Sequence, residues 1–287
     1  MKQLNLFIEL MRLKKPIGFM LLFWPCAWGL TLAYDFSDKI NDYFFYLTLF
    51  FLGSLLMRSA GCVVNDILDK EFDKKVSRTK NRPIASGKVS IKLGLTYVIF
   101  LCLLALFVLL NFNTLTILLA LGSMPLAFTY PLMKRYTYWP QLFLGITFNY
   151  GLILGWICIK NQIDIIPLIF YLGAIFWTLG FDTIYGYQDI KDDEIIGLKS
   201  TSIKFKSNPY MFLNLCYLIF AVSLLVIGYL MKLSNLYFLF CVVIIFQMFY
   251  FQVYKLNYKN PSNCLQTFKS NNLLGLLIFL NFLIGQI

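Results

Sequence analysis

Residues 43–64 read YFFYLTLFFLGSLLMRSAGCVV, and the chain continues through Asn65-Asp66-Ile67-Leu68-Asp69-Lys70-Glu71-Phe72-Asp73. In the first part Arg58 is the one charged residue, and the run is long enough for a transmembrane helix, which needs about 20 mostly apolar residues. The second part contains four carboxylates. These residues predict a membrane-spanning helix that ends in an acidic cluster.

Eight further apolar runs of about this length occur along the chain. Together the nine cover residues 18–34, 43–64, 90–111, 114–131, 141–159, 165–186, 209–231, 235–254 and 272–287. Of the 287 residues, 59% are hydrophobic and only 14% are charged, whereas soluble domains are near 25% charged. This composition excludes a disordered chain and a small disulfide scaffold, and it argues strongly against a soluble enzyme. We predict an all-α polytopic membrane protein with about nine transmembrane helices in a single domain, residues 1–287.

The basic residues predict how the helices are oriented. If the N-terminus is cytoplasmic, 22 of the 25 Lys and Arg residues lie on the cytoplasmic side, and only Lys39, Lys160 and Lys232 lie outside. Cytoplasmic loops of membrane proteins carry such an excess. The net charge of +11 is therefore a topology signal, so nucleic acid is not an expected partner. The C-terminus should lie outside.

Cysteine and histidine chemistry is not expected. The seven cysteines contain no CxxC pair and mostly lie in apolar runs, so we expect neither disulfides nor thiolate metal sites. The chain has no histidine, which removes the commonest general base and metal ligand.

The acidic residues gather in two short segments. Nine of the 14 are Asp66, Asp69, Glu71, Asp73, Asp182, Asp189, Asp192, Asp193 and Glu194. The segments follow the second and sixth predicted spans, so both open to the same side. Carboxylates at membrane depth are functional by default.

The spacing within each segment predicts one helix face. Asn65, Asp69 and Asp73 are spaced i, i+4, i+8, and Asp182, Asp189 and Asp193 are spaced i, i+7, i+11. Like charges so close repel unless cations lie between them. Oxygen ligands without His or Cys suit Mg²⁺, which commonly bridges to substrate phosphates.

Two facing clusters could hold a diphosphate through Mg²⁺, with basic side chains on the remaining phosphate oxygens. The candidates are Arg78, Arg82, Lys134, Arg135 and Lys199. The alternative is that these are solvated charges at a membrane surface.

These segments resemble the signatures of the UbiA-type membrane prenyltransferases. Asn65–Asp73 with Arg78-Thr79-Lys80-Asn81-Arg82-Pro83-Ile84-Ala85-Ser86-Gly87 is similar to the first signature, and Asp189-Ile190-Lys191-Asp192-Asp193 is similar to the second. Arg12–Gly18, Trp24-Pro25 and Tyr130–Thr137 resemble the 4-hydroxybenzoate polyprenyltransferase branch in particular. The resemblance covers residues from about 10 to 206, and the last three spans match in hydropathy alone. Gln188 departs from the pattern.

The resemblance implies a nine-helix bundle around a central cavity with cytoplasmic cap loops, here residues 65–90 and 182–206. It implies an enzyme that uses Mg²⁺ to ionise a polyprenyl diphosphate and attaches the chain to 4-hydroxybenzoate, ortho to the phenol, early in ubiquinone synthesis. Such an enzyme would lie in a bacterial or mitochondrial inner membrane, with lipid around it and its active site on the cytoplasmic or matrix-like side.

The resemblance also implies residue roles. The metal ligands would be Asn65, Asp66, Asp69, Asp73, Asp189 and Asp193. Lys134, Arg135 and Lys199 would grip phosphate oxygens, joined by Arg78 and Arg82.

Four further residues are candidates for the site. Tyr130 lies one turn before Lys134 and could orient the acceptor or the reactive carbon, unless it is an interfacial belt tyrosine. Tyr185 lies one turn before Asp189 and could bond a phosphate or a metal-bound water. Arg58 or Arg12 could pair with the acceptor carboxylate. Arg12 could equally be a positive-inside anchor, whereas Arg58 is costly to bury without a partner.

Two segments outside the spans differ in character. Residues 77–90 are long and polar, and we expect them to cap the diphosphate site. Residues 255–271 are expected to form a surface loop.

Two other functions remain open from the sequence. One is a sister enzyme that uses another acceptor, such as a naphthoate or haem. The other is a transporter or a non-catalytic lipid-binding protein, although a transporter usually places its carboxylates near the midplane. The sequence determines neither the prenyl chain length nor the oligomeric state.

Overall fold

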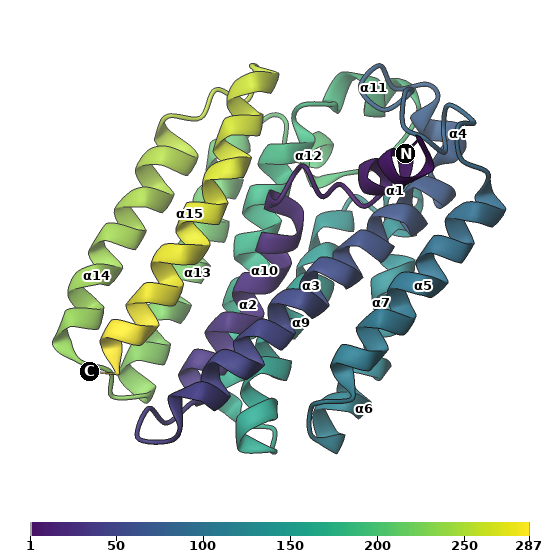
Figure 1. Cartoon of the computed structure of the whole chain (residues 1–287). Coiled ribbons are helices and arrows are strands. Elements are labelled where there is room, and N and C mark those ends of the chain that lie inside the picture. The colour runs from purple at the N-terminus through teal and green to yellow at the C-terminus, as the bar shows by residue number, and fades with distance from the viewer. Residues whose placement is uncertain (1, 287) are drawn as a thin grey trace.

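The computed structural model describes residues 2–286, which form a bundle of helices without a strand (Figure 1). The membrane helices are α2 (Ile17–Ala33), α3 (Ile40–Leu68), α5 (Ile91–Leu109), a broken fourth helix (Thr114–Tyr136), α9 (Pro140–Lys160), α10 (Ile165–Gly186), α13 (Pro209–Leu230), α14 with the π-helical η2 (Asn235–Phe246 and Gln247–Tyr254), and α15 (Pro261–Gly285). Eight are long and apolar enough to cross a membrane, and α2 is somewhat shorter. The described chain thus confirms the prediction of an all-α bundle of about nine spans.

Short helices lie at one end of this bundle. They are α1 (Lys2–Leu10), α4 (Lys70–Asp73), α11 (Ile190–Ile195) and α12 (Thr201–Lys204). Figure 1 shows all four near the N-terminus, whereas the C-terminus lies at the opposite end. The helix α1, the acidic segments and the loop 77–90 therefore share one end of the molecule.

The fourth span is a broken helix. It consists of α6 (Thr114–Gly122), α7 (Met124–Thr129), the 3₁₀ turn η1 (Tyr130–Leu132) and α8 (Met133–Tyr136). Pro125 and Pro131 lack the N–H that an unbroken helix would require, and the regular α-helix is interrupted next to each of them. The span continues to Tyr136, beyond the predicted end at residue 131. This extension places Lys134 next to Asp69, which directly follows α3.

The prediction of a surface loop over residues 255–271 is wrong for most of that segment. The last helix, α15, begins at Pro261, well before the predicted start at residue 272. The Asn260 side chain accepts hydrogen bonds from the N–H groups of Ser262 and Asn263, which is a standard N-cap. The first turns are polar on one face, which lowers their hydropathy, but Cys264 and Phe268 are buried on the other.

Glycines allow α2 and α9 to cross at close range near the centre of the bundle. A Cβ on Gly29 would lie 2.0 Å from the carbonyl oxygen of Leu152, and one on Gly155 would lie 2.3 Å from that of Cys26. Small residues commonly mark such backbone contacts between membrane helices. The α2–α9 crossing is therefore fixed by residues that have no side chain.

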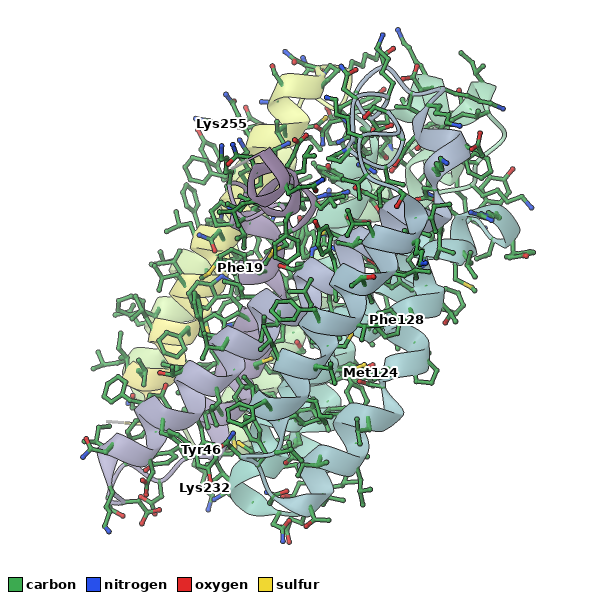
Figure 2. The ribbon with its side chains drawn as sticks, turned by 45° about the vertical axis from the view of Figure 1, so that its right-hand side comes forward. Phe19, Tyr46, Met124, Phe128, Lys232 and Lys255 are labelled. Atoms are coloured by element: carbon green, nitrogen blue, oxygen red, sulfur yellow. The ribbon has the colours of Figure 1, made fainter. Side chains whose placement is uncertain are left out.

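Lysines that the sequence assigns to opposite sides of the membrane lie towards opposite ends of the bundle. Figure 2 shows Lys232 at one end of the bundle and Lys255 towards the other. Hydrogen bonds connect neighbouring helices at the end that contains Lys232. The Ser234 N–H donates to the Gly285 carbonyl, and the Asn113 side chain donates to the Ile157 carbonyl. The opposite end contains both acidic segments.

Candidate active site

A polar cavity of about 260 Å³ lies between the two acidic segments. Of the predicted site residues, those on its wall are Arg12, Arg58, Asn65, Asp69, Asp73, Arg78, Arg82, Tyr130, Lys134, Tyr185, Asp189, Asp193 and Lys199. Asp66 and Arg135 are not on this wall. The structure thus gathers most of the predicted residues around one space, although they come from helices far apart in sequence.

The spacing prediction for the acidic segments is only partly right. The helix α3 ends at Leu68, and Asp69 has non-helical dihedral angles (φ −95°, ψ 6°) before α4 begins. Backbone hydrogen bonds from Asp69 to Asn65 and from Asp73 to Asp69 still span four residues. The second segment is interrupted in the same way, since α10 ends at Gly186. Neither segment is therefore one continuous helix, since a second short helix begins after each break, at Lys70 and at Ile190.

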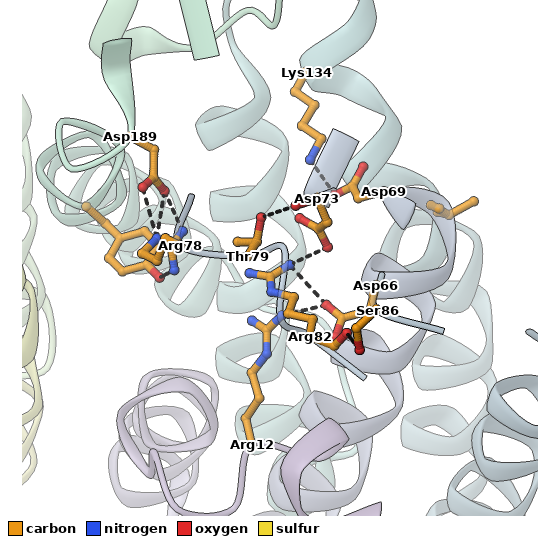
Figure 3. Close-up of polar contacts among 12 residues, drawn as sticks. Arg12, Asp66, Asp69, Asp73, Arg78, Thr79, Arg82, Ser86, Lys134 and Asp189 are labelled. Atoms are coloured by element: carbon orange, nitrogen blue, oxygen red, sulfur yellow. Dashed lines mark hydrogen bonds and ion pairs between the residues drawn. The ribbon is translucent and has the colours of Figure 1, made fainter. Parts of the chain in front are cut away.

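Asp69 lies at the centre of the first segment. Its side chain is 1% exposed and forms an ion pair with Lys134 (Figure 3). The other carboxylate oxygen, Oδ1, lies 3.7 Å from Nη2 of Arg135 and accepts no hydrogen bond. Arg135 donates to the Leu68 carbonyl at 2.6 Å and covers the Phe72 ring, which explains why it lies behind the wall.

Arg82 joins the remaining carboxylates of the first segment. Its Nη1 donates to Asp66 at 3.1 Å and to Asp73 at 2.8 Å, and Asp66 also accepts from Arg12 at 2.7 Å (Figure 3). Burial raises the pKa of the Asp73 carboxyl, and Arg82 opposes that effect. Asp66 is therefore placed to orient Arg12 and Arg82, whereas its predicted role as a metal ligand has no support from its position.

Arg78 and Asp189 form the second group of charges. The Arg78 guanidinium donates to both carboxylate oxygens of Asp189, with Nε at 2.9 and 3.0 Å, and its Nη1 donates to the Tyr185 hydroxyl at 3.1 Å. Burial and the neighbouring Asp189 raise the pKa of Asp193 to about 6, while Lys134 and Arg78 lower it. The ion pair links the loop 77–90 to the end of α10.

The loop 77–90 is packed against the bundle. Ile84 and Val89 are buried with Leu10 of α1 and Val63 of α3. This small apolar cluster holds the segment that supplies Arg78 and Arg82 to the cavity.

The donor atoms suit a cation that prefers oxygen. Within residues 2–286, no three acidic or cysteine side chains converge on a metal-binding position. Mg²⁺ usually takes one or two carboxylates and completes its shell with water and substrate phosphate. The buried, unpartnered Oδ1 of Asp69 is a suitable ligand of this kind. The residues fit a Mg²⁺ ion shared with a phosphate ligand.

A second cavity, of about 540 Å³, adjoins the polar one. Arg58, Tyr130 and Phe148 line both spaces. The second cavity runs between α3, α5, the broken fourth helix and α9, and its other lining residues are almost all apolar. Met124 and Phe128 belong to its wall and lie on the fourth helix in Figure 2. Where one central cavity was predicted, two adjoining cavities lie inside the bundle, one lined by charged residues and the other by apolar ones.

Asp182, which the sequence places in the second acidic segment without a role of its own, lines the polar cavity near Arg58. Its position inside a membrane span indicates a function. Gln141, Phe148 and Phe268 also line the cavity and were not predicted. No comparable signal existed for the phenylalanines, because the chain has 29 of them.

Comparison with known proteins gives a consistent result. The model of the UbiA prenyltransferase family matches residues 22–283. The chain is 41% identical over 290 residues to the mitochondrial 4-hydroxybenzoate polyprenyltransferase of Rattus norvegicus, covering all of this chain and 76% of that protein. It is 38% identical over 289 residues to 4-hydroxybenzoate geranyltransferase 1 of Lithospermum erythrorhizon, covering all of this chain and 92% of that protein.

Solved structures share the fold. A UbiA homolog from Aeropyrum pernix K1 superposes with a TM-score of 0.73 at 20% identity, covering 94% of this chain and 99% of that one. A UbiA homolog from Archaeoglobus fulgidus, bound to GPP and Mg²⁺, gives a TM-score of 0.72 at 16% identity, covering 97% and 98%. With a family match over almost its whole length, this chain belongs to the UbiA prenyltransferase family.

Proposed function

We propose that the protein transfers a polyprenyl chain from a polyprenyl diphosphate to 4-hydroxybenzoate, ortho to the phenol, as an early step of ubiquinone synthesis. The observation that carries this proposal is that a charged cavity and an apolar cavity share part of their walls. A prenyl diphosphate has a highly charged head and a long apolar tail, and the charged cavity shares Arg58, Tyr130 and Phe148 with an apolar cavity of about 540 Å³. The choice of 4-hydroxybenzoate as the acceptor is supported by the names of the relatives from Rattus norvegicus and Lithospermum erythrorhizon.

The diphosphate binds in the polar cavity. Asp69, Asp73, Asp189 and Asp193, with Asn65, line this cavity and would hold Mg²⁺, which would stabilise negative charge on the leaving group. The UbiA homolog from Archaeoglobus fulgidus bound to GPP and Mg²⁺ supports this choice of ion.

Basic side chains bind the phosphate oxygens directly. Arg78, Arg82 and Lys134 line the cavity and already lie within bonding distance of the carboxylates, and Lys199 lies on the same wall. Preorganised donors of this kind stabilise negative charge as it develops on the departing diphosphate.

The reactive carbon lies at the junction of the cavities. When its bond to the diphosphate oxygen breaks, an allylic cation forms, and the ring carbon of the acceptor then bonds to it and loses a proton. The rings of Tyr130 and Phe148 line this junction, and aromatic rings attract cations. These residues shield the cation from water until the new bond forms.

The acceptor carboxylate pairs with an arginine at the same junction. Arg58 lines both cavities, and its Nε is buried and has no hydrogen-bond partner. Its guanidinium also lies 5.2 Å above the Phe148 ring. Arg12 lines the polar cavity as well, but its Nη2 is bonded to Asp66. The structure therefore favours Arg58 as the acceptor residue and Arg12 as part of the acidic network.

The active site faces the cytoplasm or the mitochondrial matrix. The excess of basic residues at the end that contains the site supports this orientation. A bacterial or mitochondrial inner membrane is the setting in which such a site would meet its substrates.

Incubation of purified membranes with a labelled prenyl diphosphate tests the proposal. With Mg²⁺, lipid-soluble product should form from 4-hydroxybenzoate and not from dihydroxynaphthoate or haem, and EDTA should abolish its formation. Product from another acceptor alone would replace this function with that of a sister enzyme. Absence of product from every acceptor would favour a non-catalytic role.

A further inference from the structure

Phe268 connects the C-terminal helices to the site. Among residues 2–286, it is the single residue of α13, α14, η2 and α15 that lines either cavity. Its side chain is almost entirely buried. The sequence motifs that indicate the site all lie before residue 207, so they assign Phe268 no role, although the match to the family extends to residue 283 and corrects the expectation that the last spans match in hydropathy alone.

The Phe268 ring packs against an aromatic face of α10. Its centroid lies 4.5 Å from that of Tyr185 and 5.8 Å from that of Phe181, and Phe181 in turn packs on Trp177 at 4.9 Å. Trp177, Phe181 and Tyr185 are spaced i, i+4, i+8, so they form one stripe on α10. Phe268 packs against the end of this stripe that lines the polar cavity, where Tyr185 lies.

Tyr185 transmits this contact to the charged residues. Its hydroxyl accepts a hydrogen bond from Nη1 of Arg78 at 3.1 Å, and Arg78 holds Asp189. The Arg78 guanidinium also lies 5.5 Å from the centre of the Tyr185 ring. A shift of this ring would therefore move the guanidinium and its carboxylate partner.

A buried polar network fixes the rotation of α15 about its axis. Asn271 is fully buried, accepts from the Trp177 indole N–H at 2.9 Å and donates to Oε1 of Gln252 at 3.0 Å. Gln252 lies on η2 and donates to Ser270 at 3.0 Å. Polar groups inside a membrane require partners, so any other rotation would leave several of them unsatisfied. Phe268, one turn before Asn271, is thereby aimed at Tyr185.

We propose that Phe268 is a positioning residue for the diphosphate end of the site. It holds the Tyr185 ring, and through that ring the Arg78 guanidinium, in the place where phosphate oxygens bind. This inference rests on the proposed function in one respect, namely that Tyr185 and Arg78 bind the diphosphate.

The test is a double-mutant cycle on the full-length purified protein. Binding of inorganic pyrophosphate in the presence of Mg²⁺ is measured calorimetrically for wild type, Phe268→Ala, Tyr185→Ala and the double variant. Phe268→Ala should weaken binding about tenfold, which is the scale of one misplaced charge-assisted bond. The double variant should bind no more weakly than Tyr185→Ala, because Phe268 acts through Tyr185.

Kinetics and two further variants separate positioning from general stability. In Phe268→Ala the KM for prenyl diphosphate should rise while the KM for the acceptor stays unchanged, and Phe268→Leu, which keeps most of the volume and the fold, should recover part of the affinity. Phe282→Ala is the matched control, since Phe282 is a buried phenylalanine of α15 that packs on Phe170 and Tyr237 away from the site. It should leave pyrophosphate binding unchanged.

Three results would overturn the inference. They are wild-type affinity in Phe268→Ala, effects of the two single variants that simply multiply, and an equal loss of affinity in Phe282→Ala. A wild-type protein that fails to bind pyrophosphate would overturn it together with the diphosphate site. A wild-type protein that binds pyrophosphate but does not prenylate 4-hydroxybenzoate would overturn the proposed function alone, and the cycle would still decide the role of Phe268.

Discussion

Asp69 and Asp189 lie on opposite sides of the polar cavity, and each is paired with a basic residue that a phosphate could also attract. Replacing either by asparagine keeps its shape but removes the charge. We expect kcat to fall at least 10²- to 10³-fold, which is about the effect of losing one preorganised electrostatic contact. Turnover of labelled prenyl diphosphate measures this loss.

The matched control is Glu71→Gln. Glu71 belongs to the same acidic segment, but its side chain is 72% exposed and pairs with Lys74 on the surface. It should turn over at the wild-type rate. Equal losses in Glu71→Gln and Asp69→Asn would show that the segment acts through its total charge and that the cavity carboxylates have no special role.

Arg58 and Arg12 should differ in which substrate they affect. Arg58→Ala should raise the acceptor KM ten- to hundredfold, since a lost charge-assisted bond is worth roughly 1.5–3 kcal/mol. The KM for prenyl diphosphate should change little. Arg12→Ala should instead affect the prenyl diphosphate, because Arg12 is bonded to Asp66, which also holds Arg82.

Steady-state kinetics with each substrate varied in turn distinguishes the two arginines. Arg58→Lys, which keeps the charge, serves as the conservative control and should recover part of the acceptor affinity. A normal acceptor KM in Arg58→Ala would mean that the carboxylate binds elsewhere.

At the scale of the elements, the stability of the bundle should be sensitive to a single methyl group added where α2 crosses α9. A Cβ at Gly29 would meet the Leu152 carbonyl oxygen at 2.0 Å, and this backbone group cannot move aside as a flexible side chain can. Overpacking costs about 1–3 kcal/mol in general, and Gly29→Ala should lie at the upper end of that range. Thermal inactivation of the detergent-solubilised protein should occur at a clearly lower temperature.

Gly122→Ala provides the comparison, since it adds the same methyl group where, apart from the adjoining helix backbone, no atom of the described residues lies within 4 Å. Its inactivation temperature should match that of wild type. If Gly29→Ala is equally stable, the two helices do not cross as closely as described.

At the scale of the whole molecule, both acidic segments must open to the same side of the membrane. A cysteine introduced at Ser77 or at Lys191 should react with an impermeant thiol reagent from the cytoplasmic or matrix side only, and one at Ser37 from the other side only. All three positions are exposed. Ser200 is unsuitable for this purpose because it is 7% exposed.

The background of this labelling should be low. Six of the seven native cysteines are buried, and Cys102 is partly buried. Labelling of Ser77 and Lys191 variants from opposite sides would contradict a shared site.

The sequence by itself determined the membrane helices, their approximate number and the two acidic segments. Hydropathy acts residue by residue over about 20 positions, so a run such as residues 43–64 is legible without knowledge of its neighbours. The same locality explains the errors. Residues 261–271 are polar on one face, so their hydropathy did not predict the first turns of α15. The other face is buried only because it contacts α10 and η2.

Only the tertiary structure decided which charged side chains meet. Arg78 and Asp189 are 111 positions apart, and no local pattern pairs them. The same is true of the placement of Asp66 and Arg135 outside the cavity wall and of Phe268 on it. Charges attract or repel according to distance in space, and that distance is set by how the helices pack against one another. The packing depends on close contacts such as Gly29 with Leu152, which the sequence of either helix alone does not contain.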